Sequence, residues 1–484
     1  MRMIKALISK TSSIIRRHEG PGLSSIRIAE YNTERGKINA KYICHAPFSN
    51  MYFNVHGDCA PCWLTFQDPD SYPNKSINEI WFGEKFQKIR EDLSQYDLTY
   101  KCNVCLKNLQ NKNYTSVLSR AYDANEIKKY PTMMELELGN TCNLECVMCI
   151  GELSSSIRKN RDNLPPLISP YDENFVDQLE EFIPHLKELR INGGEPFLIP
   201  LTYSIFERVE KLNPELKIVI ATNGTVLNNK VKSWLEKLNI NINFSLDSLT
   251  PNIYEEIRKN AKFSRVIENF HVFNEYCKNN NRTICLMVNP MRNNWFEMPN
   301  FINFANENNV NIWFNTIHRP VSLAIWSLPS YKIEEIFNSL SQKKFKVNHS
   351  SNYIAKNNIR IYEGLAKTQL KNWLKEAQER EKVEDIVLEG LTEEKAKTVV
   401  KERIKNYIYL NYDEGEEQKK YRLKKIYSKL EYIKQNLAEY EDLADFYTHT
   451  MLKSNLPMLL KEIETKSDKI LLHQHIEDVR KEND

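Results

Sequence analysis

Short apolar strands alternate with amphipathic helices between residues 130 and 320. Six runs have the composition and length of strands, at 133–138, 186–191, 217–222, 240–246, 282–288 and 311–315. Helical periodicity lies between them, at 173–182, 202–211, 230–237, 252–258 and 264–278. Six consecutive strand–helix units predict an α/β fold with a parallel sheet that curves into a partial (βα)6 or full barrel. Chemistry in such barrels is found at the carboxyl ends of the strands.

The pattern changes on both sides of this region. Before it, a strand at 51–55, a turn at 56–58 and a helix from Ser76 through Leu93 accompany several cysteines. After residue 325, Lys and Glu dominate and glycine is rare, and residues 423–447 repeat apolar side chains in steps of three and four. We expect that last helix to dock within the protein, with a dimeric coiled coil as the alternative. Further helices are expected at 352–371 and 392–410.

The predicted domains are an N-terminal arm at 1–39, a cysteine-rich module with its linker at 40–130, the barrel at 131–325 and a C-terminal helical domain at 326–484.

The net charge and the hydropathy of the chain bear on whether it binds nucleic acid or a membrane. The net charge of +3 gives no general electrostatic case for nucleic acid or for an acidic membrane surface. No apolar run approaches the ~20 residues that span a bilayer. The basic segment Met1–Arg17 lacks a compact apolar core and a small-residue cleavage site, so we expect a surface helix or frayed terminus rather than a secretory signal or membrane anchor. A reducing, cytoplasmic location follows as an expectation.

The ten cysteines are unevenly distributed. Eight fall in tight groups between Cys44 and Cys149, whereas Cys277 and Cys285 stand apart and are expected to be small apolar core residues. In a long chain without a secretory signal, clustered cysteines more often bind metal than form disulfides.

The array Cys142-x3-Cys146-x2-Cys149 follows the first predicted strand of the barrel. Three thiolates on one short loop can hold three irons of a cubane cluster and leave the fourth iron without a protein ligand. A site with four cysteine ligands suits electron transfer only, whereas an open iron can bind and activate a small molecule.

The N-terminal cysteines allow two interpretations. Cys59-x2-Cys62 with Cys102-x2-Cys105 has the composition of a zinc ribbon, but 39 residues separate the two pairs, more than the ~15–20 typical of such sites. The alternative, which we favour, takes Cys44, Cys62, Cys102 and Cys105 as four ligands of a 4Fe–4S cluster and leaves Cys59 spare.

Polar residues and glycines follow each barrel strand. They are Asn192–Pro196, Asn223–Gly224, Ser245–Asp247, Asn289–Pro290 and His318–Arg319. Taken singly, each is better explained as a turn or a helix cap. Their shared position beside the cysteine loop instead favours a binding site that contains Gly193, Gly194, Glu195, Ser245 and Asp247.

The cysteine array and the Gly-Gly-Glu-Pro run at 193–196, in a six-fold β/α pattern, resemble the radical SAM superfamily. The resemblance implies that Cys142, Cys146 and Cys149 bind a 4Fe–4S cluster whose fourth iron is chelated by the amino and carboxylate groups of S-adenosylmethionine. It further implies which residues contact the cofactor. The methionine amino group would be met by Gly193, Gly194 and Glu195, and the ribose or carboxylate by Ser245 and Asp247. Other parts of the cofactor would be lined by Asn223, Arg258 and Asn289. Met148 stands where such enzymes often place an aromatic residue, a departure that weakens the adenine contact.

The N-terminal module resembles the auxiliary-cluster modules called SPASM or twitch domains. Cys44-x12-Gly57-x4-Cys62 and the helix start at Ser76 fit their opening pattern, and the single later pair Cys102/Cys105 implies one auxiliary 4Fe–4S cluster. In the family the module usually follows the barrel, whereas here it precedes it.

The resemblance implies an enzyme that reductively cleaves S-adenosylmethionine to a 5′-deoxyadenosyl radical and abstracts hydrogen from its substrate. An external donor of flavodoxin or ferredoxin type would supply the electron. Our first expectation is an oxidoreductase that modifies a peptide or protein with help from the auxiliary cluster. The alternatives are a dehydrogenase or epimerase of a small metabolite (a sugar, nucleoside or amino acid), and a non-enzymatic iron–sulfur or zinc scaffold with a partner-binding helical tail. No residue is assigned as catalytic acid, base or hydrogen donor.

Overall fold

The structure is a computed structural model of the 484-residue chain. It describes residues 22–37, 40–65, 68–345, 353–384, 392–411 and 415–437, with short stretches at 459–460, 462–463, 468 and 471–472. The expectation for Met1–Arg17 therefore lies outside the described residues. Within the described residues, none of the helices has the length and hydropathy of a membrane span.

The chain forms two compact units. One contains residues 1–53, 58–134 and 391–472, and the other contains 54–57, 135–390 and 473–484. The helical region predicted at 326–484 is thus divided: its first part, to residue 390, belongs to the unit of the barrel, and residues 391–472 belong to the unit of the cysteine-rich module.

Six strands of the barrel unit form one parallel array. They are β4 (Met133–Glu137), β6 (Glu188–Asn192), β7 (Lys217–Thr222), β8 (Ile240–Ser245), β10 (Ile284–Val288) and β11 (Asn311–Phe314). They follow one another in the sheet in chain order. The parallel register sets Ile220 beside Ile242 and Leu286 beside Phe244, all almost wholly buried. The structure therefore confirms the predicted α/β class and each of the six predicted strands.

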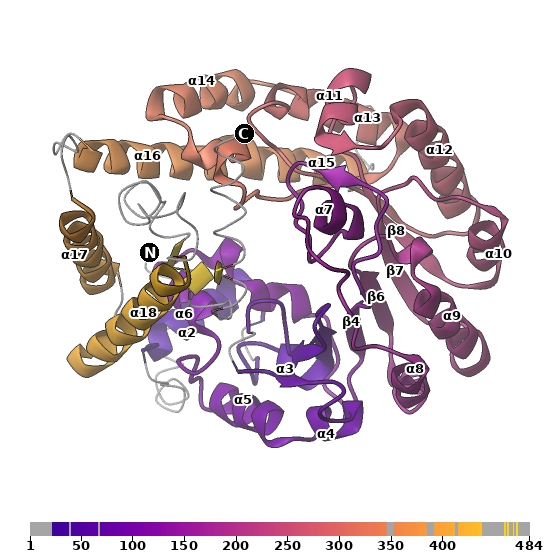
Figure 1. The fold of residues 1–484 in the computed structure, drawn as a ribbon, viewed down its shortest axis with the longest axis horizontal. Coiled ribbons are helices and arrows are strands. Elements are labelled where there is room, and N and C mark those ends of the chain that lie inside the picture. The colour runs from indigo at the N-terminus through magenta and orange to yellow at the C-terminus, as the bar shows by residue number, and fades with distance from the viewer. Residues whose placement is uncertain are drawn as a thin grey trace. The chain divides into compact units, whose positions relative to one another are not determined.

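Helices cover the outer side of these strands (Figure 1). They are α8 (Glu173–Leu179), α9 (Pro200–Leu212), α10 (Asn229–Lys237), α11 (Pro251–Ile257), α12 (Phe263–Asn279) and α13 (Met298–Asn308). Each presents an apolar stripe to the sheet, as Ile205, Phe206 and Val209 of α9 do. The strands alternate accordingly: in β6 the buried Leu189 and Ile191 alternate with the partly exposed Glu188 and Arg190.

The last strand, β11, is covered by α15 (Tyr353–Glu363), and one asparagine of α15 forms hydrogen bonds with the backbone at this strand. Asn358 is fully buried; it accepts a hydrogen bond from the Ile312 N–H at 3.1 Å and donates to the Val310 carbonyl at 2.9 Å. Its amide thus satisfies backbone groups of the sheet edge that would otherwise be buried unpaired. A π-helical stretch, Gly364–Gln369, joins α15 to α16 (Leu370–Glu384), and α14 (Ser330–Ser341) packs against α16.

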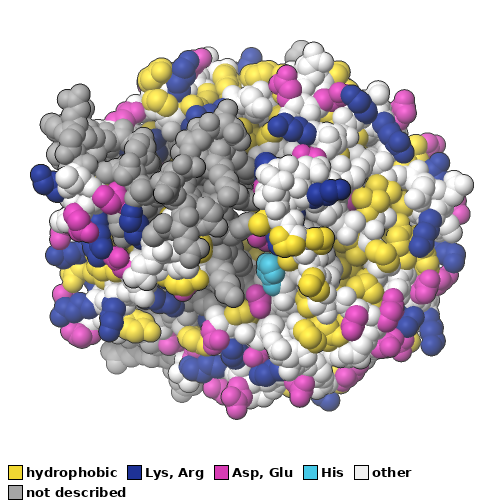
Figure 2. Space-filling view, in the orientation of Figure 1, with side chains coloured by type: hydrophobic (Ala, Val, Ile, Leu, Met, Phe, Trp, Pro, Cys, Tyr) yellow, Lys and Arg dark blue, Asp and Glu magenta, His cyan; other side chains and the backbone are white. Residues whose placement is uncertain are grey.

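The other unit is built around short strands and helices. Antiparallel strands β1 (Asn50–Phe53), β2 (Asp58–Ala60) and β3 (Asp70–Ser71) form the predicted hairpin and its extension. The helices are α2 (Ser25–Glu34), α3 (Ala46–Ser49), α4 (Ile77–Trp81), α5 (Glu84–Ser94), α6 (Asn103–Gln110), α17 (Glu393–Asn411) and α18 (Glu416–Leu437). Helix α18 buries its 423–437 apolar face within this unit, whereas the heptad positions beyond 437 lie outside the described residues. On the face drawn in Figure 2, cationic and anionic side chains are interspersed, in keeping with the small net charge.

Candidate functional site

The cysteine loop is held by a run of three serines that follows it. Ser154 donates to the Leu144 carbonyl at 2.7 Å and caps the short helix α7 (Ser155–Asn160). Ser155 accepts from the Cys142 N–H at 3.1 Å, and Ser156 donates to the Cys142 carbonyl at 2.8 Å. These bonds fix the backbone at the first cysteine. Sequence reasoning missed them, although three consecutive serines after the array were a visible signal.

The two glycines after β6 bring their backbone against the same loop. The Gly194 N–H donates to the Gly139 carbonyl at 3.0 Å, and the Glu195 N–H donates to the Thr141 carbonyl at 2.7 Å. Gly193 has a φ of +95°, and a Cβ atom on Gly194 would lie 2.3 Å from the Thr141 carbonyl oxygen. Glycine is therefore required here by close backbone approach, and the carbonyl groups rather than the N–H groups are left to accept from a ligand's amino group.

Glu195 is fully buried below this loop and is surrounded by donors. Its carboxylate accepts from the Asn223 N–H at 2.7 Å, the Thr222 hydroxyl at 2.8 Å and the Phe197 N–H at 3.3 Å. Burial raises the pKa of Glu195 to about 7, and the hydrogen bonds from its donors oppose that rise. A carboxylate in this state gains stability from an incoming ammonium group, which is the role that the resemblance gives it.

Asp247 connects three parts of the site. One carboxylate oxygen accepts from the Asn289 N–H at 2.7 Å and from its side-chain amide at 2.8 Å. The other accepts from Arg258 Nε at 2.8 Å and Nη2 at 2.7 Å. Asn294, which sequence reasoning missed, is also buried and donates to the Asp247 backbone carbonyl at 2.7 Å. Asp247 thus ties the ends of β8 and β10 to Arg258.

Arg258 reaches the cysteine loop through an unpredicted two-residue ladder. Strand β9 (Arg258–Lys259) pairs antiparallel with β5 (Glu145–Cys146), which sets Arg258 opposite Cys146. Arg258 Nη1 lies 3.9 Å from the Cys146 sulfur. Asn223 Nδ2 lies 3.8 Å from the Cys142 sulfur. Donors that face thiolate sulfurs fit a bound iron–sulfur cluster, whose sulfurs are hydrogen-bond acceptors.

The structure therefore gathers most of the predicted rim residues around one loop. Ser245 ends β8 beside Met287, and Met148 is half-buried in the cysteine loop. Burial raises the pKa of Cys146 to about 11 and that of Cys149 to about 12, so ligation at neutral pH has to release the thiol protons. The ten cysteines are all free thiols, and Cys277 is buried in the core as expected, while Cys285 is only partly buried.

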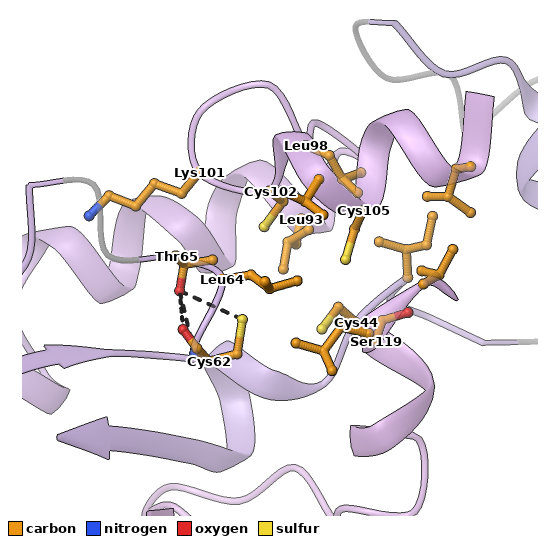
Figure 3. Close-up of a pocket in the computed structure, with 15 residues that line it drawn as sticks. Cys44, Cys62, Leu64, Thr65, Leu93, Leu98, Lys101, Cys102, Cys105 and Ser119 are labelled. Atoms are coloured by element: carbon orange, nitrogen blue, oxygen red, sulfur yellow. Dashed lines mark hydrogen bonds between the residues drawn. The ribbon is translucent and has the colours of Figure 1, made fainter. Parts of the chain in front are cut away.

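The four predicted auxiliary ligands surround a second site. Cys44, Cys62, Cys102 and Cys105 line a single, largely apolar cavity, and their sulfurs stand around a common space in Figure 3. Burial raises the pKa of Cys44 and Cys102, and the neighbouring thiols raise it further, which places these four side chains in mutual electrostatic range. Cys102 directly precedes α6 and Cys105 lies in its first turn, where the helix N-terminus favours thiolates.

The geometry of this cavity bears on the choice between zinc and a cluster. Zinc draws its sulfur ligands to about 2.3 Å from one ion. Four cysteines around one cavity can supply one ligand to each iron of a cubane cluster. Cys59 is not among the described residues that line the cavity; its thiol lies near Asp70 and Asp58 instead.

One buried cation, missed in the sequence, positions the first of these cysteines. The Arg35 side chain is 1% exposed and binds Asp123 at 2.6 Å. It also donates to the carbonyls of Tyr42 at 3.1 Å and Ile43 at 2.9 Å. Arg35 therefore fixes the two peptide groups that precede Cys44.

Comparisons with known proteins agree with this geometry. Residues 136–305 match the model of the radical SAM superfamily, and residues 44–106 match SPASM, described as an iron–sulfur cluster-binding domain. Residues 136–305 therefore belong to the radical SAM superfamily. The cofactors are accordingly S-adenosylmethionine and a 4Fe–4S cluster in the barrel, with an additional iron–sulfur cluster in the SPASM-type module. That module precedes the radical SAM barrel in the chain, as the cysteine spacing predicted.

Curated relatives match part of this chain. A GTP 3′,8-cyclase from Limosilactobacillus fermentum is 24% identical over 233 residues, which cover 46% of this chain and 65% of the relative. Another GTP 3′,8-cyclase, from Desulforamulus reducens, is 30% identical over 145 residues, 28% of this chain and 39% of the relative. The chain thus spans less than two thirds of either relative. Among solved structures, Streptococcus suis SuiB bound to S-adenosylmethionine shows 15% identity and a TM-score of 0.34, over 52% of this chain and 56% of SuiB.

Proposed function

We propose that this chain is a radical SAM oxidoreductase that modifies a peptide or protein, with its auxiliary cluster as electron acceptor. The observation that carries the first half of this proposal is the three-cysteine loop pinned against the Gly193–Gly194–Glu195 backbone. That arrangement would leave one iron of a bound cluster without a protein ligand, and it holds the buried Glu195 carboxylate next to the cysteine loop. When bound, the cofactors supply one-electron cleavage of S-adenosylmethionine and a radical that removes hydrogen from the substrate.

The chain's own residues hold and orient this chemistry. Cys142, Cys146 and Cys149 would hold the cluster. Glu195 and the glycine carbonyls would receive the methionine amino group. Ser245, Asn223, Arg258 and Asn289 lie on the same rim and would line the rest of the cofactor. Asn223 and Arg258 already face cysteine sulfurs, and Asn289 is held by Asp247.

The four-cysteine site of the module supports the second part of the proposal, in which the auxiliary cluster accepts an electron from the substrate. Cys44, Cys62, Cys102 and Cys105 can saturate every iron of a cubane, which suits electron transfer rather than substrate ligation. In net terms the substrate would lose one hydrogen atom to the radical, then one electron to the module and one proton to the surroundings. A new double bond or a new cross-link is the expected product.

A second candidate acts on a small metabolite. The curated relatives named GTP 3′,8-cyclase favour it, because they are 24% and 30% identical to this chain over 233 and 145 residues. In that case the same cofactor site would serve a nucleotide-sized substrate.

Formation of 5′-deoxyadenosine tests the radical-generating half. Anaerobically reconstituted, dithionite-reduced protein should convert S-adenosylmethionine to methionine and 5′-deoxyadenosine. The matched control replaces Cys142, Cys146 and Cys149 by Ala and leaves the module intact; it should retain the auxiliary iron and make no product. Intact clusters without 5′-deoxyadenosine would refute the proposal, and zinc in place of iron in the triple variant would refute the auxiliary cluster.

The substrate classes separate on product analysis. A short peptide encoded beside the gene for this chain, co-expressed with it, should lose two hydrogens by mass spectrometry. Conversion of GTP or another nucleotide in place of the peptide would favour the small-metabolite candidate.

A further inference from the structure

The three cysteine sulfurs of the barrel loop have different neighbours. The Cys142 sulfur faces the neutral amide of Asn223 at 3.8 Å. The Cys146 sulfur faces the guanidinium of Arg258, with Nη1 at 3.9 Å. The remaining cysteine is approached by a cation at its backbone, where Arg161 Nη2 donates to the Cys149 carbonyl at 2.9 Å. Among these contacts, the one between a charged group and a sulfur occurs at Cys146.

Arg258 is fixed in that position from its other edge. Its Nε and Nη2 atoms both donate to one oxygen of Asp247, which leaves Nη1 as the nitrogen that points away from the carboxylate. The Arg258 side chain is 8% exposed and that of Asp247 is 0% exposed, so water screens neither charge. The nearest charge to the Cys146 sulfur is therefore the cation, with its counter-ion on the far side.

The acceptor capacity of Asp247 is also used up. A carboxylate has about four lone-pair sites. All are occupied by the two donors of Arg258 and the two of Asn289, at 2.7–2.8 Å. Asp247 has no site left for a ribose hydroxyl, which is the contact that the resemblance suggested. Its contribution is to hold Arg258.

We propose that Arg258 raises the reduction potential of the cluster bound by the three-cysteine loop, and that Asp247 holds its guanidinium at the Cys146 sulfur. This inference rests on the proposed function only in requiring that the cluster be bound. Reduction adds one negative charge to the cluster, and a nearby buried cation stabilises the reduced form more than the oxidised form. Easier reduction of this cluster is what electron delivery for S-adenosylmethionine cleavage requires.

The test is an EPR-monitored redox titration of the reconstituted holoenzyme without S-adenosylmethionine. Arg258→Gln should lower the ratio of reduced to oxidised barrel cluster at least tenfold at a fixed potential, equal to about 59 mV for one electron. Arg258→Lys keeps the charge and should stay within threefold of wild type. Arg161→Gln is the matched control: it removes a 28% exposed cation that contacts a backbone carbonyl and should also stay within threefold. The auxiliary cluster, titrated in the same sample, should not move.

A double variant guards against misfolding. Arg258→Gln with Asp247→Asn exchanges the ion pair for a neutral hydrogen-bonded pair, and its potential should still fall because the cation is the nearer charge. An unchanged or raised potential in both Gln-bearing proteins would overturn the inference. So would weaker binding of S-adenosylmethionine with no change in potential, since Arg258 would then act only as a cofactor contact. Loss of 5′-deoxyadenosine from wild type with normal potentials would instead count against the proposed function alone.

Discussion

Gly194→Ala should disrupt the cofactor site through backbone displacement alone. The new methyl group would lie 2.3 Å from the Thr141 carbonyl oxygen and 2.7 Å from the carbonyl carbon of Asn140. Both contacts are with backbone, so neither can be relieved by a side-chain rotation. Restoring an ordinary separation of 3.4 Å requires a movement of about 1.1 Å, the difference between 3.4 and 2.3 Å, between this turn and the cysteine loop.

The cost follows from what that movement breaks. The hydrogen bonds from Gly194 N–H to Gly139 and from Glu195 N–H to Thr141 are lost or stretched, at about 1 kcal/mol each. Steric overlap in a packed site adds about 1–3 kcal/mol. A total of about 3–5 kcal/mol should lower the melting temperature of the barrel unit by about 6–20 °C, at about 2–4 °C per kcal/mol.

Gly139→Ala is a matched control in the segment after β4, whose carbonyl accepts from the Gly194 N–H. No atom lies within 4 Å of its added Cβ, and its φ is not in the left-handed region. This variant should melt within about 2 °C of wild type. The assay is anaerobic thermal unfolding followed by circular dichroism, together with iron content after reconstitution. The reasoning is refuted if Gly194→Ala melts and loads iron like wild type, or if Gly139→Ala is equally damaging.

Three further predictions concern single side chains. Burial raises the pKa of Glu195 from 4.5 to about 7, so the folded apoprotein binds the Glu195 proton more tightly than the unfolded chain does. This proton's contribution to stability is present below pH 4.5 and is lost as the pH rises to about 7. Urea unfolding should therefore show Glu195→Gln gaining stability relative to wild type over that pH range, and parallel pH profiles for the two proteins would contradict this. Asn358→Ala removes the partner of two backbone groups at the sheet edge and should cost about 2–4 kcal/mol in the same assay. The control Asn357→Ala removes a half-buried side chain that accepts a hydrogen bond from Arg360, and it should cost about 1 kcal/mol or less. Cys62→Ser should lose the iron of the auxiliary cluster and Cys59→Ser should keep it; equal losses would show that Cys59 is a ligand.

The sequence was most informative where burial imposes a pattern. All six barrel strands were predicted, and β7 has the predicted bounds, because the buried face of a strand has to carry apolar residues, as Leu189 and Ile191 do in β6. The helix expected from Ser76 through Leu93 is instead two helices. Gly83 separates α4 from α5 with an extended ψ of 167°, and a Cβ there would meet the Glu79 carbonyl at 2.3 Å. A single glycine inside a helical pattern can be tolerated or can end the helix, and the sequence pattern alone does not tell which.

The sequence allowed the candidate ligands of the site to be predicted, but not the residues that hold them in place. Cysteine spacing and strand-end position pointed to Cys142 and Glu195 because both carry recognisable chemistry. The ladder between β5 and β9 is two residues long, too short to leave any periodicity. Asn294 is equally hidden, since its amide reads as a loop residue until the fold brings it to the Asp247 carbonyl.

Asp247 shows why motif position alone does not assign a role. Its place at the end of β8 and its acidic side chain are those of a cofactor contact, and the sequence supports that interpretation. The fold adds two donors from Arg258 and two from Asn289, and these four hydrogen bonds fill the carboxylate. The residue at the rim that still has donors to offer is Arg258, which Asp247 orients toward the Cys146 sulfur. In this structure the Asp247 carboxylate therefore binds Arg258 and Asn289, and the Arg258 guanidinium is the group that faces the cysteine loop.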